Sequence, residues 1–471
     1  MKSIKNIKIV LLFGLLILLI GCTSINLTEK QPINFIIVLT DDQRYDTMEA
    51  MPYTTSVIFD QGIAFDKAYV TTSRCCPSRS SILTGMYAHN HNVRVNSDNL
   101  MEKTMFSFLH DEGYATGLVG KYLNSYPKEG TEPPLPEFDL WAALVSGPDT
   151  AAYNDPMMNV NGTWEQQEGY QTYVLRDFAL EFIQTSIDND QPFALLFSPF
   201  APHLPAKAAV EHKDLFKDIP LHRPPNYNPE SMPGKPEWLQ SIEPMDAWWQ
   251  AKIDKDRSKQ LQTLVSVDES IKAIMQLLDE NKQLDNTMVI FLSDNGMFWG
   301  EHRLYTSKIY VYEESTHIPM AIYYPPLIRE GIHEKRIIAN IDIAPTIYDF
   351  AGLAIPESVD GLSLRPILEK DETFEWREHL LIEGWPVNVA FTENTPPFQA
   401  IHSGQYVYVE TGNDLSEFYN LDLDPFQLDN EINNPQYADI IQHMQAALEE
   451  ERKSINPAPP SSGAYGVEMP R

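Results

Sequence analysis

Strand-like runs of mainly apolar residues recur along the chain, at residues 33–39, 115–119, 193–197 and 288–292. Each run is short and continuous rather than alternating, which is typical of strands buried on both faces of a parallel sheet. Helical patterns lie between the runs. The clearest covers residues 254–282, where apolar positions recur every three or four residues. This order of elements predicts an α/β fold with a mostly parallel central sheet.

From about residue 373 the pattern changes. Residues 399–402 and 405–409 flank Ser403-Gly404, which predicts a β-hairpin, and another short strand and a helix follow. We therefore expect a small antiparallel sheet with a helix after the larger domain. The predicted divisions are the large domain over residues 33–372, the small α+β region over residues 373–456 and a flexible, proline- and serine-rich tail over residues 457–471.

The first 22 residues have the pattern of an export signal. Lys2, Lys5 and Lys8 precede an apolar run that ends in Leu-Ile-Gly-Cys at Cys22. This ending is typical of a bacterial lipoprotein, so we expect residues 1–21 to be removed, Cys22 to carry lipid, and residues 22–32 to tether a periplasmic or cell-surface protein to a membrane. An ordinary signal peptide or a single anchor helix is the alternative.

The composition of the chain limits the classes of binding partner that can be expected. The 471-residue chain has a formal net charge of −31, which argues against a nucleic acid partner. An anionic substrate would need a local basic pocket that overcomes the general negative field. If Cys22 carries lipid, Cys75 and Cys76 are the remaining cysteines, so no long-range disulfide framework is expected.

Polar residues follow each of the four strand-like runs. Because parallel strands bring their carboxyl ends to one rim of the sheet, we expect these side chains to converge. Two adjacent buried carboxylates would be costly unless a cation paired with them, and a hard cation is the natural partner. A solvated acidic loop is the alternative for any single pair. The residues concerned are Asp41 and Asp42, Lys121 after Gly120, His203, and Asp294 with Asn295.

The stretch Cys75-Cys76-Pro77-Ser78-Arg79 predicts a reactive group at the start of a helix. Pro77 suits the first helical turn, and the free amide groups there favour a bound anion. Buried small hydrophobic residues or a strained vicinal disulfide are the alternatives for the two cysteines.

The same stretch resembles the Cys-x-Pro-Ser-Arg signature of the formylglycine-dependent sulfatases, and Thr84-Gly85 matches the Thr-Gly that follows it. Further family-like segments cover residues 294–315, 341–347 and 360–364. The resemblance implies an alkaline-phosphatase-like α/β/α sandwich whose motif cysteine, here Cys75, is oxidised to formylglycine (3-oxoalanine) by a separate maturation enzyme. The Cys-Cys pair and the His-Asn-His-Asn segment look most like the branch of glucosamine-6-sulfatases and heparan endosulfatases.

The resemblance also implies a set of site residues. Calcium would be held by Asp41, Asp42, Asp294, Asn295 and the group made from Cys75, and the hydrated aldehyde would attack the sulfur of a sulfated carbohydrate. Arg79 would orient the aldehyde, Lys121 and Lys308 would hold sulfuryl oxygens, and His203 would protonate the leaving oxygen. His302 would either contact the sulfate or support the site from behind.

One position departs from the family pattern. Many sulfatases have a histidine two residues after the motif lysine, where this chain has Leu123, and His89 or His91 are candidates to replace it. Two other functions remain open. One is a phosphodiesterase or phosphonate monoester hydrolase of the same superfamily, and the other is a lipoprotein that binds sulfated glycan without turning it over.

Overall fold

A computed structural model describes residues 32–124, 126–127, 134–145, 153–328, 330–389 and 393–454. The predicted signal peptide, the predicted lipid attachment site Cys22, the predicted tether up to residue 31 and the tail over residues 457–471 lie outside the described residues. Within the described part, no helix combines the length and the apolar character needed to cross a membrane.

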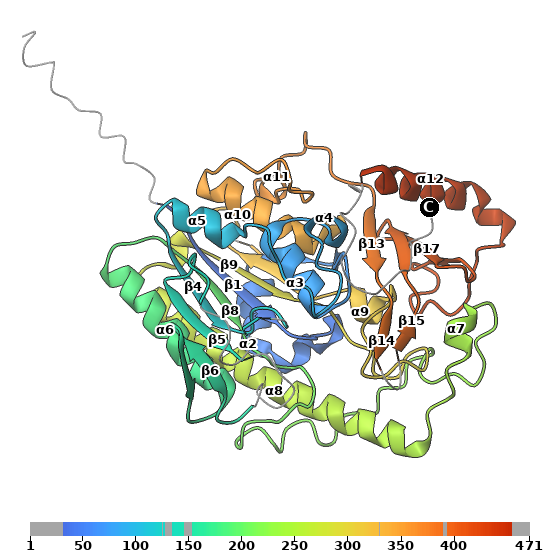
Figure 1. Ribbon diagram of the computed structural model, residues 1–471, viewed down its shortest axis with the longest axis horizontal. Helices are drawn as coiled ribbons and strands as arrows, with labels where there is room; N and C mark the ends of the chain where they lie inside the picture. The colour runs from blue at the N-terminus through green and yellow to red at the C-terminus, as the bar shows by residue number, and fades with distance from the viewer. Residues whose placement is uncertain are drawn as a thin grey trace, which may run out of the picture. The chain divides into compact units, whose positions relative to one another are not determined.

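The four predicted strands are adjacent and parallel in the order β9-β1-β8-β4 (Figure 1), as the sequence pattern indicated. They form the centre of one mixed sheet, whose full order is β11-β2-β10-β9-β1-β8-β4-β5-β6-β7. The strands span β1 (Asn34–Thr40), β2 (Ile63–Phe65), β4 (Ala115–Gly120), β5 (Leu140–Leu144), β6 (Met157–Val160), β7 (Thr163–Gln166), β8 (Phe193–Ser198), β9 (Thr287–Ser293), β10 (Met320–Tyr323) and β11 (Ile332–Glu334).

Helices cover both faces of this sheet, which makes the fold a three-layer α/β/α sandwich (Figure 1). Successive side chains of a strand point to opposite faces, so Phe35 and Ile37 of β1 join one core while Ile36 and Val38 join the other. The first core is closed by α3 (Cys75–Thr84), α5 (Met105–Asp111) and α10 (Ile343–Ala351), and the second by α6 (Gln171–Asp188) and α8 (Ala247–Glu280).

Helix α8 begins at Ala247, seven residues before the start expected from its apolar spacing. The reason is local: the side chain of Asp246 accepts a hydrogen bond from the Trp249 backbone N–H and so caps the helix. The shorter helices are α2 (Pro52–Thr54), α4 (Ala88–His91), α7 (Glu237–Gln240), α9 (Glu313–Thr316) and α11 (Arg365–Leu368).

The predicted small region is an antiparallel sheet of order β13-β16-β17-β18 with α12 (Ala438–Ser454) packed on it. Its strands are β13 (Leu380–Gly384), β16 (Phe398–His402), β17 (Tyr406–Thr411) and β18 (Glu417–Asn420). The Glu383 backbone N–H donates to the Thr71 carbonyl at 2.9 Å, which joins the sheet to the segment leading into α3. Two-stranded pairs are formed by β3 (Ala68–Tyr69) with β12 (Ile338–Ala339) and by β14 (Val387–Val389) with β15 (Glu393–Thr395).

Candidate active site

Strand register brings the predicted site residues to one rim of the sheet. Thr40 of β1 lies opposite Ser293 of β9, so Asp41 and Asp294 leave the sheet side by side. Gly120 of β4 lies opposite Ser198 of β8 and delivers Lys121 to the same rim. Gly120 has φ +117°, and a Cβ atom there would lie 2.0 Å from the Ser198 carbonyl oxygen. Glycine is therefore required for this close approach of two strands.

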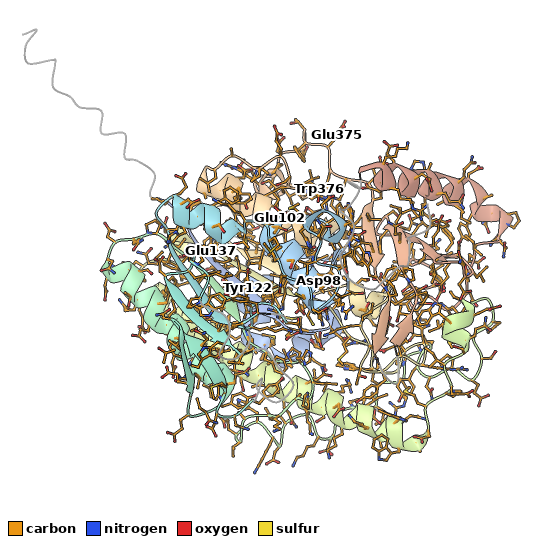
Figure 2. All side chains as sticks on the ribbon, in the orientation of Figure 1. Asp98, Glu102, Tyr122, Glu137, Glu375 and Trp376 are labelled. Carbon is orange, nitrogen blue, oxygen red and sulfur yellow. The ribbon has the colours of Figure 1, made fainter. Side chains whose placement is uncertain are left out.

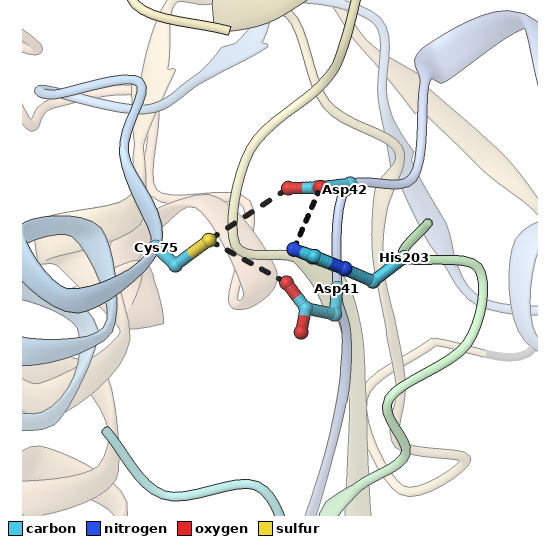
Figure 3. Close-up of side chains that lie close together, drawn as sticks. All are labelled: Asp41, Asp42, Cys75 and His203. Atoms are coloured by element: carbon cyan, nitrogen blue, oxygen red, sulfur yellow. Dashed lines mark hydrogen bonds and ion pairs between the residues drawn. The ribbon is translucent and has the colours of Figure 1, made fainter. Parts of the chain in front are cut away.

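Cys75 is the first residue of α3, and its thiol faces this rim (Figure 3). Its Sγ lies 3.6 Å from Asp41 Oδ1 and 3.8 Å from Asp42 Oδ1, and it accepts a hydrogen bond from Lys308 Nζ at 2.8 Å. Cys76 is directed elsewhere: its Sγ lies 3.8 Å from the carbonyl of Asp98, a residue labelled beside α3 in Figure 2. Both cysteines are free, so the vicinal disulfide alternative is wrong.

Buried cations pair with the carboxylates. Lys121 Nζ lies 2.5 Å from Asp41 Oδ2, and Lys308 Nζ contacts Asp42 Oδ1. Arg79 Nε donates to Asp294 Oδ2 at 2.7 Å, and its Nη1 donates to Ser198 Oγ at 2.7 Å. Three cations thus match three carboxylates in a largely buried region, so a divalent cation and an anionic ester could enter together without a large charge imbalance.

The segment after β9 completes a set of ligands that a hard cation could use. Asp294 Oδ1 accepts from the Asp42 backbone N–H at 3.0 Å, and Asn295 Nδ2 donates to Asp42 Oδ1 at 2.6 Å. The buried Asn295 Oδ1 has no hydrogen-bond partner among the described residues. An orphaned carbonyl oxygen beside carboxylates fits a cation that takes oxygen ligands. The structure therefore brings Asp41, Asp42 and Cys75 into one group of close ligand atoms, and hydrogen bonds connect Asp294 and Asn295 to Asp42.

The protonation states follow from burial and charge. Burial raises the pKa of Asp41, but Lys121, His203 and Arg79 outweigh it and hold that pKa at about 2. Burial raises the pKa of the Cys75 thiol to about 12, and the neighbouring lysines oppose this only in part. The Asp41 carboxylate is thus charged and the Cys75 thiol is neutral at pH 7. A neutral buried thiol is a poor nucleophile, which fits a site whose cysteine is changed to another group.

His203 is held at the accessible side of the cluster, with about a quarter of its side chain exposed. Its Nδ1 donates to the Leu204 carbonyl at 2.5 Å, and its own carbonyl accepts from the Tyr153 hydroxyl at 2.8 Å. Its Nε2 faces Asp42 Oδ2 at 3.4 Å. Because a carbonyl can only accept, the proton of a neutral His203 sits on Nδ1, and Nε2 is free to receive and return a proton. Asp41, Asp42, Cys75 and His203 offer ligand atoms within 4.8 Å of one another.

Three other histidines, His302, His89 and His91, were candidates from the sequence, and their partners in the structure are as follows. His302 is buried, stacks on Tyr312 with ring centroids 4.0 Å apart, and faces Asn226 Nδ2 at 3.2 Å, so its two alternative roles stay predictions. His89 Nδ1 pairs with Glu383 at 2.8 Å, and His91 Nε2 pairs with Ser81 Oγ at 3.0 Å. Both are buried and paired in this way, and whether either replaces the histidine missing at Leu123 stays a prediction.

Sequence reasoning missed two residues that support the site. Ser198 ends β8 and accepts from Arg79, and a hydroxyl at the end of a buried strand was the available signal. Gln260 of α8 is buried and donates to the Pro202 carbonyl at 3.1 Å, directly before His203, while its Oε1 accepts from Trp299 at 2.7 Å. No local pattern marks this glutamine, because its partners are distant in the sequence.

Comparison of the chain with known proteins identifies its family. The profile described as Sulfatase matches residues 33–353. The chain belongs to the sulfatase family. A second profile, described as the C-terminal part of N-sulphoglucosamine sulphohydrolase, matches residues 300–454. Sulfatases generally use a formylglycine and a divalent metal ion, and the cluster around Cys75 has the residues for both.

Individual sulfatases agree with the predicted branch. The extracellular sulfatase Sulf-1 homologue of Caenorhabditis elegans is 35% identical over 81% of this chain, and the alignment covers 56% of that relative's length. Human N-acetylglucosamine-6-sulfatase is 32% identical over 78% of this chain and 70% of its own. A solved structure described as a complex with its substrate D-glucosamine-2-N,6-O-disulfate superposes with a TM-score of 0.80 at 25% identity, covering 90% of this chain and 98% of that one.

Proposed function

We propose that this sulfatase hydrolyses an O-sulfate ester on a carbohydrate, with a 6-sulfated amino sugar or a sulfated polysaccharide fragment as its substrate. The observation that carries the proposal is the position of the Cys75 side chain, whose Sγ lies 3.6 Å from Asp41 Oδ1 and 3.8 Å from Asp42 Oδ1 and accepts a hydrogen bond from Lys308 Nζ. The glucosamine-6-sulfatase relatives and the solved complex with a 6-O-sulfated glucosamine support the choice of sugar.

The proposal includes a formylglycine made from Cys75 and a calcium ion held by Asp41, Asp42, Asp294 and Asn295. When present, the hydrated aldehyde supplies a nucleophilic hydroxyl and the cation supplies Lewis acidity at the sulfuryl group. Calcium is favoured over a transition metal because carboxylate and amide oxygens dominate the ligand set.

The chain's own residues supply orientation, charge and a proton. Lys121 and Lys308 place two ammonium groups beside the carboxylates, where they can bind the oxygens of an incoming sulfate ester. Arg79 of α3 is held by Asp294, which follows β9, and by Ser198, which ends β8. It therefore ties α3 to the ends of these two strands. His203 Nε2, once protonated, can transfer its proton to the departing sugar oxygen, because Nδ1 stays anchored on Leu204.

The test joins mass spectrometry to a substrate panel. Protein co-expressed with a formylglycine-generating enzyme should show the aldehyde in the peptide that contains Cys75, and should release sulfate from 6-sulfated glucosamine derivatives. Cys76→Ser is the matched control, because Cys76 faces the core and should leave turnover unchanged, whereas Cys75→Ala should abolish it. A clear preference for phosphate diesters or phosphonate esters would overturn the proposed reaction. An unconverted thiol in protein from the native host, together with glycan binding, would favour the non-catalytic alternative.

We further propose that Cys22 carries lipid and anchors the protein in a bacterial membrane facing the periplasm or the cell surface. The motif Leu-Ile-Gly-Cys supports this, together with the lysines before it. Labelled fatty acid should enter the wild-type chain and not a Cys22→Ser variant, and the variant should move to the soluble fraction. Equal labelling of both chains would refute the anchor.

A further inference from the structure

A buried carboxylate in the small sheet lies outside the chemistry described above. Glu417 begins β18 and is fully buried. Its carboxylate accepts hydrogen bonds from the hydroxyls of Tyr310 at 2.5 Å, Tyr312 at 2.7 Å and Tyr419. The ammonium group of Lys235 lies 3.7 Å away, and burial lowers its pKa to about 8 against the opposing effect of Glu417. One carboxylate thus gathers donors from three separate parts of the chain.

Two of these donors follow an active-site residue closely. Tyr310 and Tyr312 lie two and four residues after Lys308, whose ammonium group contacts Asp42 and lies 2.8 Å from Cys75 Sγ. Helix α9, which begins directly after Tyr312, lies beside the small sheet (Figure 1), and its Glu313 pairs with His402 of β16 at 3.0 Å. The segment that carries Lys308 is therefore held to the small sheet by the contacts of Tyr310, Tyr312 and Glu313.

The same anchor reaches the Cys75 side of the site. The Tyr310 carbonyl accepts a hydrogen bond from Ser73 Oγ at 3.0 Å, and Ser73 lies two residues before Cys75. Tyr310 is thus held by its hydroxyl to Glu417 and by its carbonyl to the approach to α3. The positions of the Lys308 ammonium and of the group at residue 75 both depend on where Tyr310 sits.

Stability is a weak explanation for this arrangement. Removing an ionised carboxylate and a lysine from water is costly, and replacing a buried ion pair with apolar residues of similar size is often neutral or stabilising. A buried polar network with every member paired does, however, allow one geometry only. The core around Glu417 is otherwise apolar and aromatic, with Phe398, Val407 and Val409 fully buried nearby.

We propose that Glu417 is a positioning residue that sets the place of the Lys308 ammonium through Tyr310 and Tyr312, so that the small sheet is part of the catalytic machinery. This kinetic role rests on the proposed sulfatase activity. The geometric part does not, because it concerns only where Lys308 lies.

The decisive variants are Glu417→Gln and its matched control Glu410→Gln. Glu410 lies on the neighbouring strand β17 and also accepts from a phenol, Tyr408, at 2.8 Å, and it pairs with Arg452 at 2.6 Å. These partners stay within the small region and do not touch the Lys308 segment. Crystal structures of both variants, compared with wild type, report the geometry directly. Steady-state kinetics on a sulfate ester and thermal unfolding are measured on the same preparations.

In Glu417→Gln we expect the Lys308 ammonium to move by about 1 Å or more from its place beside residue 75, and kcat/KM to fall roughly tenfold to a hundredfold. Glu410→Gln should change neither. In a Lys308→Ala background the additional effect of Glu417→Gln on kcat/KM should disappear, although any change in thermal stability should persist. If Glu417 had a merely structural role, Glu417→Gln would change the melting temperature in both backgrounds, and its effect on kcat/KM would remain in the Lys308→Ala background.

The outcomes separate the two claims. If Lys308 keeps its position in the Glu417→Gln crystal, the inference is overturned, whatever the kinetics show. If Glu417→Gln lowers kcat/KM by the same factor with and without Lys308, Glu417 acts by another route and the inference fails. If wild type turns over no sulfate ester while Glu417→Gln still displaces Lys308, the positioning role stands and the proposed function fails.

Discussion

The pair formed by Arg79 and Asp294 offers the sharpest test of how the site is held together. Both side chains are buried, with 1% and 0% of their surfaces exposed, and Arg79 Nε lies 2.7 Å from Asp294 Oδ2. Substituting Arg79→Met keeps an unbranched, mainly apolar side chain and removes the guanidinium charge. Asp294 and Asp41 then lose a cation that they cannot replace with water.

The expected cost follows from this burial. Removing one partner of a buried ion pair typically destabilises a protein by about 3–5 kcal/mol, because the other charge stays buried and unpaired. Asp294→Asn added to Arg79→Met removes that orphaned charge and keeps an oxygen for the Asp42 backbone N–H. The free energy of unfolding of the double variant should therefore exceed the value expected from summing the two single costs by about 1–3 kcal/mol.

Urea unfolding with a chelator present measures these values without a contribution from bound cation. Arg365→Met is the matched control, since Arg365 lies 2.8 Å from Glu369 but both side chains are over a third exposed. It should cost less than about 1 kcal/mol. If the Arg79 and Asp294 costs add to within about 0.5 kcal/mol, the two side chains are energetically independent and the argument from buried charge is refuted.

Three further predictions concern the backbone, pH and the cation. Gly120→Ala should lower stability by about 1–3 kcal/mol in thermal melts, because the new Cβ would meet the Ser198 carbonyl, and it should reduce turnover by displacing the neighbouring Lys121. Gly113→Ala is the control: a Cβ there has nothing within 4 Å, so this variant carries only the cost of its positive φ. Burial lowers the pKa of His89, but Glu383 outweighs this and raises that pKa above the usual value. The pair should therefore stabilise the fold below about pH 6.5 and lose that contribution as pH rises through the higher folded pKa, so urea midpoints of His89→Gln should fall less steeply over that range than those of wild type. Calcium at a hundred times its dissociation constant should add about 2.7 kcal/mol to the free energy of unfolding, and an Asn295→Leu variant, which lacks the orphaned oxygen, should gain much less at the same calcium concentration.

Much of the site could be predicted because its residues follow local sequence patterns that indicate the ends of strands. The run from Phe35 to Leu39 is continuously apolar, and such a run becomes a doubly buried strand whose following residues lie at the sheet's edge. Asp41, Lys121 and Asp294 each follow a strand of this kind, so convergence at one rim needed only the parallel order of the strands. The resemblance of the Cys75 stretch to the sulfatase signature added the identity of the reactive residue.

Other features required the tertiary structure. The resemblance singled out Cys75, but the pattern of apolar and polar residues alone does not direct Cys75 toward the carboxylates and Cys76 toward the core, since that depends on how α3 packs against the sheet. His302 follows the Asp294 segment closely in sequence, yet the fold stacks it on Tyr312 and places it beside Asn226.

The sequence by itself determined the α/β class, the parallel sheet and the polar residues at the ends of its strands, because periodicity and strand ends are local properties. Only the tertiary structure decided which buried charges pair and which element holds each one. Glu417 lies more than a hundred residues from Lys308, and Gln260 lies nearly sixty from His203. Contacts between such distant positions depend on how whole layers pack, and no short segment of sequence encodes them.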